Sequence, residues 1–159
     1  MTAGSLLAGA RLLSANMRPA CDVQIGSPMP QEAKVLPPIF LLYGFAVECL
    51  LKGLWVSQGN RMVVGEKFVG ITGIRGHELH KMAKKVNFTT SAEEEAILQG
   101  LHAKIVSSAR YPIGVNWGIA RATRYPNGGF GSRTTFHSGD IEVIEKMIGR
   151  LVAALGFDA

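Results

Sequence analysis

The positively charged side chains of this sequence are concentrated in one segment that contains no carboxylate. Between Ala96 and Gly139 there is no Asp or Glu, whereas Lys or Arg stands at five positions: Lys104, Arg110, Arg121, Arg124 and Arg133. These five residues equal the net charge of +5, so the remainder of the chain is neutral on balance. We therefore expect an anionic partner to meet this acid-free segment first.

Aromatic side chains are interleaved with these arginines. Arg-Tyr-Pro occurs twice, at 110–112 and 124–126, and Trp117, Phe130 and Phe136 add further rings. Arginines combined with stacking rings are typical of proteins that bind single-stranded nucleic acid. The residues that we expect to bind RNA or a nucleotide-type anion are Arg110, Tyr111, Arg121, Arg124 and Arg133. In the alternative interpretation, the rings anchor a long loop and the arginines pair with the acidic starts of helices.

A second chemical candidate is a charge pair inside an apolar stretch. Glu48 and Lys52 stand one helical turn apart, in the order that favours an intrahelical ion pair. In one interpretation the pair ties neighbouring helices together, because an unpaired buried charge is strongly destabilising. In the other, Glu48 orients an arginine or a histidine within a site. The sequence leaves both interpretations open.

Two further patterns resemble known sites but lack a required part. In His77-Glu78-Leu79-His80 the histidines are three positions apart, whereas the zinc motif HExxH separates them by four. We therefore expect no metal site, with His77 capping a helix and His80 at the surface. The Gly-x-x-Gly-x-x-Gly spacing from Gly70 is not followed by Gly-Lys-Ser/Thr, so a phosphate loop is not predicted.

The cysteines and the first residues favour a cytoplasmic protein. Cys21 and Cys49 form no CxxC pair, which argues against a disulfide framework and a zinc finger. Cys49 should be inert packing in an apolar helix rather than a nucleophile. Residues 1–20 have no basic cluster before an apolar core, so they do not resemble a secretory signal.

These side chains must be positioned by helices, of which the longest is predicted at 36–58. Pro37-Pro38 suits the first turn of a helix and Gly59-Asn60 ends one. The apolar run only just reaches the roughly 18–20 residues that cross a bilayer. Its two charges would each cost about 2.5–3.5 kcal/mol at mid-membrane. We therefore interpret it as the central, buried helix of a soluble protein.

Apolar residues at helical spacing predict four shorter helices around this one. Their expected ranges are about 5–17, 77–86, 91–109 and 138–155. A capping box at Ser91 and Glu94 begins the third of these, and Gly156 ends the last. Residues 59–76 are expected to form a loop, and 111–139 a long irregular loop. The fold class is all-α: a mainly antiparallel bundle of about five helices, forming a single domain over 1–159.

Three of these features together resemble the HEPN domain-like proteins, a nucleotide-binding family of higher eukaryotes and prokaryotes. They are Ala46-x-Glu48-x-x-Leu51-Lys52-x-Leu54, Gly76-His77-Glu78-Leu79 and Arg110-Tyr111-Pro112. The similarity spans roughly Ser5 to Leu155. It implies a helical bundle, commonly a homodimer without a cofactor, that binds RNA or nucleotides or cuts RNA without a metal in toxin–antitoxin and defence systems.

The family members that cut RNA carry an arginine, four to six further residues and then a histidine, late in the domain. In this chain the first histidine after Arg110 is His137, and only three residues separate it from Arg133. Arg110, Arg133 and His137 are the candidates for catalysis, with histidine as acid or base and arginine stabilising charge on the phosphate. Their spacing departs from the family motif, which makes cleavage by that motif doubtful.

The sequence patterns and the resemblance leave three candidate functions. The first is binding of RNA or a nucleotide-type anion through the acid-free segment. The second is a non-catalytic, dimeric interaction partner of a nucleotidyltransferase or a similar protein encoded nearby. The third, which the motif spacing favours least, is a metal-independent ribonuclease. None of the three requires a membrane.

Overall fold

In this computed structural model, residues 2–15, 36–108, 122–124, 130–132 and 138–157 are described. In these ranges the chain is all-α, as expected. Its helices are α1 (Ala3–Ala15), α2 (Leu36–Ser57), α3 (Leu79–Lys85), α4 (Ala92–Ala103) and α5 (Ser138–Ala154). A π-helical turn, η2 (Lys104–Ser108), continues α4.

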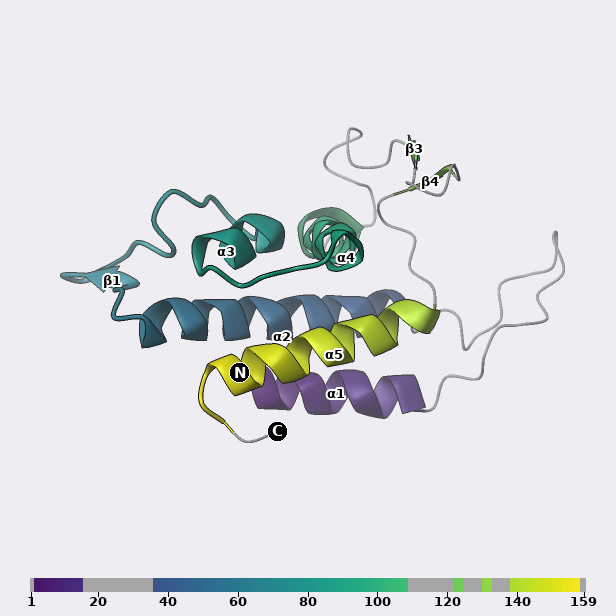
Figure 1. The fold of residues 1–159 in the computed structure, drawn as a ribbon, viewed down its shortest axis with the longest axis horizontal. Coiled ribbons are helices and arrows are strands. Elements are labelled where there is room, and N and C mark those ends of the chain that lie inside the picture. The colour runs from purple at the N-terminus through teal and green to yellow at the C-terminus, as the bar shows by residue number, and fades with distance from the viewer. Residues whose placement is uncertain (1, 16–35, 109–121, 125–129, 133–137, 158–159) are drawn as a thin grey trace, which may run out of the picture.

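The helices pack on two sides of α2. Figure 1 shows α1 and α5 alongside α2 on one side, and α3 and α4 on the other. Helix α1 runs opposite to α2, whereas α5 runs in the same direction as α2. Helix α4 is seen nearly end-on in this view, so it crosses α2. Because α2 contacts all four other helices, it is the element that positions the rest.

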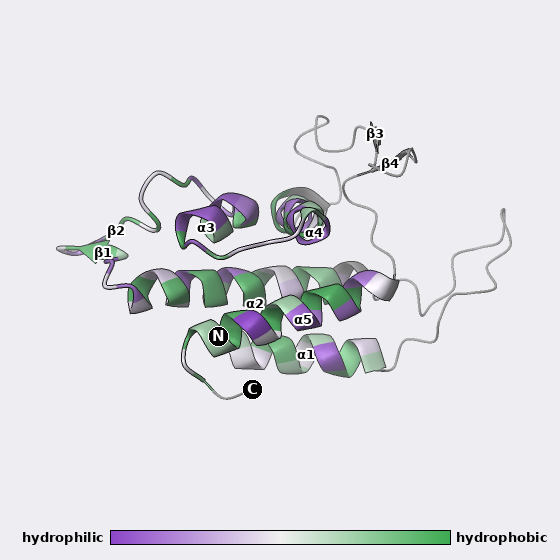
Figure 2. Ribbon diagram, in the orientation of Figure 1, coloured by the Kyte–Doolittle hydropathy of each residue, from purple (hydrophilic) through white to green (hydrophobic). Residues whose placement is uncertain are grey.

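Helix α2 is buried along most of its length, and its prediction as a central apolar helix is confirmed. Ile39, Tyr43 and Leu51 are fully buried, and Figure 2 shows apolar residues along the whole helix. By length and composition Pro38–Ser57 would also suit a membrane span, but 61% of its most apolar window is buried inside the protein. Burial on this scale is what the centre of a helical bundle requires.

The helix ends follow the local signals in the sequence. Gly59 has φ +84° and its N–H bonds to the carbonyl of Val56, while the Asn60 side chain donates to the carbonyl of Trp55 at 3.0 Å. Gly156, with φ +79°, ends α5 in the same left-handed conformation. Glycine suits these positions because it lacks a Cβ. The capping box at the start of α4 is present, with both of its hydrogen bonds.

Two short hairpins correct the predicted loops. Strands β1 (Val63–Val64) and β2 (Lys67–Phe68) pair antiparallel within 59–76. Strands β3 (Ala122–Arg124) and β4 (Phe130–Ser132) pair antiparallel within 111–139, which was expected to be irregular. The predicted loop and the predicted last helix overlapped at Ser138 and Gly139, and both residues belong to α5. Strands of two or three residues are too short to show an alternating pattern, so periodicity misses them.

Candidate functional site

Glu48, buried in the middle of α2, collects partners from two elements. It is only 4% exposed. One carboxylate oxygen accepts a hydrogen bond from Nζ of Lys52, and the other lies 2.7 Å from Nδ1 of His77, just before α3. Two donors satisfy a carboxylate that would otherwise be costly to bury. Glu48 therefore forms the intrahelical pair and also holds a histidine, so the two interpretations of the sequence coexist.

The ring and the backbone of His77 are both fixed. Because a carboxylate only accepts hydrogen bonds, Nδ1 of His77 carries the proton that points to Glu48. The carbonyl of His77 accepts a hydrogen bond from Nδ1 of His102 in α4, at 2.8 Å. Phe45 contacts the imidazole edge-to-face, with 6.3 Å between ring centroids.

The second ring nitrogen of His77 remains available. In the part of the chain that the structure describes, Nε2 of His77 has no hydrogen-bond partner, and the side chain is 29% exposed. An imidazole held in this way can exchange a proton with a bound molecule, and the Glu48 carboxylate stabilises the resulting imidazolium. The arrangement is a carboxylate–histidine pair open on one side.

A third histidine, His80, lies next to His102. Its ring centroid is 6.3 Å from that of His102, and its Nδ1 is buried without a hydrogen-bond partner among the described residues. Burial, and then the neighbouring His102, lower the pKa of His80. His80 is thus half-buried, with Nδ1 covered, where a surface position was expected. The expected capping by His77 is wrong, because Glu78 occupies the N-cap position and Glu48 binds the His77 ring.

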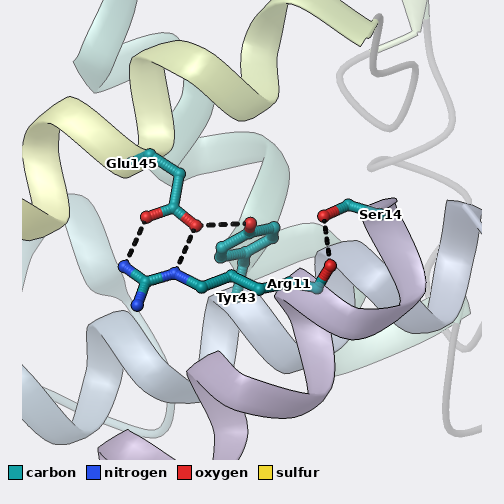
Figure 3. Close-up of polar contacts among 4 residues, drawn as sticks. All are labelled: Arg11, Ser14, Tyr43 and Glu145. Atoms are coloured by element: carbon teal, nitrogen blue, oxygen red, sulfur yellow. Dashed lines mark hydrogen bonds and ion pairs between the residues drawn. The ribbon is translucent and has the colours of Figure 1, made fainter. Parts of the chain in front are cut away.

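A different polar cluster joins α1, α2 and α5 (Figure 3). Arg11 makes two hydrogen bonds to the Glu145 carboxylate, at 3.0 and 2.7 Å, and the Tyr43 hydroxyl donates to it at 2.7 Å. The hydroxyl of Ser14 donates to the carbonyl of Arg11. Burial and the hydrogen bond to Glu145 raise the pKa of Tyr43, while Arg11 lowers the pKa of Glu145. No sequence pattern predicted this cluster, because its members are distant along the chain.

A comparison with family models, curated proteins and solved structures finds no match to this chain. The resemblance to the HEPN domain-like proteins therefore stays a prediction. The clusters described above are the direct observations from which function can be argued.

The residues predicted to bind the ligand fall mostly outside the described ranges. Of Arg124 the structure describes the backbone, in β3. The residues that lie outside are Arg110, Tyr111, Arg121, Arg133 and His137. Their roles in ligand binding and catalysis stay predictions. The acid-free segment does reach the site at its beginning, because His102 belongs to this segment and binds the backbone of His77.

Two acids in the first turn of α4 and one acid further along α5 have cationic partners. Glu94 at the start of α4 bonds to Arg150 at 2.5 Å, and the adjacent Glu95 bonds to Lys84 at 2.5 Å. In the first turns of α5, Lys146 pairs with Glu142 at 2.7 Å. All three cations come from outside the acid-free segment. An arginine of that segment would have to compete with them to be neutralised at these carboxylates.

Cys49 lies on the surface rather than in the packed core that was expected for it. Its thiol is free and the residue is exposed. Partial burial of the thiol and the adjacent Glu48 raise its pKa. The protonated thiol is a poor nucleophile, so the side chain offers little reactivity at neutral pH.

Proposed function

We propose that this chain is a HEPN-like protein that binds RNA or a nucleotide-type anion through its acid-free segment. The observation that carries the proposal is the charge distribution: five cations and no carboxylate between Ala96 and Gly139, equal to the whole net charge of +5. A charge surplus of one sign attracts phosphates, which dominate the affinity of nucleic-acid complexes.

Two contacts support this proposal. Glu94 and Glu95 at the start of α4, and Glu142 within α5, pair with Arg150, Lys84 and Lys146, which leaves these three carboxylates less able to neutralise the segment. The hydrogen bond from His102 to His77 sets the beginning of the segment beside Lys52 and the exposed imidazole. A ligand drawn to the segment would therefore meet further donors at its edge.

The wider setting belongs to the same proposal. The protein would act in the cytoplasm, as a homodimer without a cofactor and without a membrane, within a toxin–antitoxin or defence system. The competing proposal is a non-catalytic interaction partner of a nucleotidyltransferase or similar protein encoded nearby. The two differ in whether the basic side chains contact a ligand.

RNA binding in rising salt tests the proposal. We expect a labelled single strand of about 16 nucleotides, at the upper end of the site sizes of single-strand-binding modules, to bind less tightly as salt rises from about 50 to 200 mM. Replacing Arg121, Arg124 and Arg133 together by alanine should abolish binding. If some binding remains, the slope of log K against log salt concentration should be less steep by about 0.7 for each lost phosphate contact. Fluorescence anisotropy measures both quantities.

A control variant removes positive charge elsewhere. Lys81 and Lys85 are exposed, lie outside the acid-free segment and form no ion pair with an acid of α4 or α5. Their double alanine variant should retain most of the affinity. Equal losses in the two variants would show unspecific attraction to net charge. If the wild-type affinity is independent of salt concentration, or if the triple-arginine variant binds normally, the competing proposal of a non-catalytic interaction partner is favoured.

A metal-independent ribonuclease is a second candidate, favoured by the open carboxylate–histidine pair of Glu48 and His77. Nε2 of His77 would take the proton of a 2′-hydroxyl as its oxygen attacks phosphorus and the 5′-oxygen leaves. RNA cleavage in EDTA that His77→Ala abolishes and His137→Ala preserves would support it. If the wild-type protein leaves RNA intact, the ribonuclease candidate is excluded and the RNA-binding proposal still stands.

A further inference from the structure

The hairpin of β1 and β2 presents apolar side chains to solvent. Seven large hydrophobic residues are exposed in the described part of the chain, and four of them belong to this hairpin and its flank. They are Val63 (51%), Val64 (61%), Phe68 (68%) and Val69 (48%). Figure 1 shows the hairpin projecting beyond the end of α2, and Figure 2 shows its apolar character.

Cationic residues lie within this hairpin and flank it in the sequence. Between Arg61 and Arg75 the only acidic residue is Glu66. Arg61, Lys67 and Arg75 are exposed, and none of them forms a salt bridge within the described ranges. The hairpin therefore combines an exposed ring with unpaired positive charge.

Phe68 is also connected to the candidate site. Nζ of Lys52 lies 5.9 Å from the centroid of the Phe68 ring, and the same ammonium group binds Glu48. The Lys52 ammonium thus contacts both the ring and the carboxylate that holds His77. A ligand at the imidazole of His77 would have an aromatic face within its reach.

The size and charge of this surface favour a nucleic-acid base over a protein partner. The four apolar side chains offer roughly a few hundred Å², because three of them are valines, smaller than the roughly 150–250 Å² of an aromatic side chain, and each of the four is only partly exposed. A stable protein interface buries roughly 800 Å² on each partner. A single base needs only one ring face and neighbouring cations for its phosphates.

We propose that Phe68 is a stacking platform for a base of single-stranded RNA, with Arg61, Lys67 and Arg75 contacting the adjoining phosphates. This inference rests on the proposed function and extends it to a second part of the molecule, outside the acid-free segment. The stacking requires no sequence preference, because every base has an aromatic face.

Replacing Phe68 tests the inference directly. Stacking of one base is worth about 1–3 kcal/mol, so Phe68→Ala should raise the dissociation constant for single-stranded RNA roughly 5- to 150-fold. Phe68→Tyr should retain binding, since its ring also stacks. Phe157→Ala is the matched control: Phe157 is 66% exposed, like Phe68, but lies after α5. We expect no change for this variant. Because both phenylalanines are exposed, neither alanine variant should lower the melting temperature appreciably.

The outcomes separate this inference from the proposed function. Wild-type RNA binding with unchanged affinity in Phe68→Ala would overturn the stacking platform and leave the proposed function standing. Absence of wild-type binding would remove both. If sedimentation shows that Phe68→Ala turns a dimer into a monomer while RNA affinity stays constant, the hairpin is a surface for a second copy of the chain and the inference is wrong.

Discussion

At the scale of single residues, Glu145 shows how one carboxylate joins three helices. It accepts hydrogen bonds from Arg11 of α1 and from Tyr43 of α2, and it belongs to α5 itself. Two bonds from one guanidinium group fix orientation as well as distance. Apolar packing is not directional, whereas these hydrogen bonds are. The cluster therefore sets the relative positions of the three helices.

Tyr43 should make the stability of the protein sensitive to alkaline pH. Its folded pKa is raised above the ordinary value, first by burial and then by the hydrogen bond to Glu145. An unfolded tyrosine ionises near pH 10. Its contribution is therefore fully present below about pH 10 and is lost as pH rises toward the folded pKa. Tyr43→Phe should flatten this alkaline decline.

The same variant should be less stable at neutral pH. We expect Tyr43→Phe to cost about 1–2 kcal/mol at pH 7, since the hydrogen bond to a charged group is lost while Glu145 keeps Arg11. Urea unfolding of both proteins at pH 7 and about pH 11 measures the two effects. An identical pH dependence in the two proteins would contradict the assignment to Tyr43.

The sequence predicted part of the candidate site, and distance along the chain explains what it missed. The acid Glu48 was identified because a charge in an apolar helix is conspicuous, and a histidine was one of its two expected partners. That His77 is the partner depends on how α3 approaches α2, 29 residues later. The role of His102 is equally non-local, because its hydrogen bond to His77 spans 25 residues.

At the scale of elements, Gly44 allows α2 and η2 to pack closely. A Cβ at this position would lie 3.0 and 3.1 Å from two side-chain carbons of Ile105, which is fully buried. Gly44→Ala should therefore destabilise the protein by about 1–3 kcal/mol, because Ile105 must move within a packed core. Thermal or urea unfolding measures this change.

Gly149 provides the control for that substitution. It lies inside α5, and a Cβ there would have no heavy atom within 4 Å outside its own helix. Gly149→Ala should stabilise the protein by about 0.5–1 kcal/mol, because alanine favours the helix. Opposite signs for the two glycines are expected. If both substitutions destabilise the protein, the space around the added Cβ does not explain the difference expected between Gly44 and Gly149.

The helices were predictable and the strands were not, for reasons of length. Helix α2 carries 22 residues of apolar sequence bounded by proline and glycine, and α4 begins with a capping box, so local signals suffice. The strands of the two hairpins have two or three residues each. Their pairing depends on turn geometry more than on pattern. The expected loops were wrong at these positions.

At the scale of the whole molecule, the two hairpins lie at opposite ends. Figure 1 shows the hairpin of β1 and β2 beyond the last turn of α2 and the hairpin of β3 and β4 near the other end. The 22 residues of α2 make a rod of about 33 Å between them. Arg124 belongs to one of these hairpins and Phe68 to the other.

The affinity for RNA should therefore depend on strand length. An oligonucleotide of about 4 nucleotides should bind weakly, since it contacts one hairpin at a time, whereas one of about 16 should engage both and gain avidity. The double variant Phe68→Ala, Arg124→Ala should remove this gain in an anisotropy titration across lengths. Equal affinity for short and long strands would place all binding in one region.

The π-helical turn η2 holds one residue more than an α-helical turn would. In a regular α-helix each residue advances the chain by about 100°, so deleting one residue rotates everything that follows by about that angle. In η2 the wider winding accommodates the extra residue within a single turn. Deleting one residue of Lys104–Ser108 would therefore restore α-helical winding with little rotation at Ser108, whereas the same deletion inside α4 would rotate the end of the helix by about 100°.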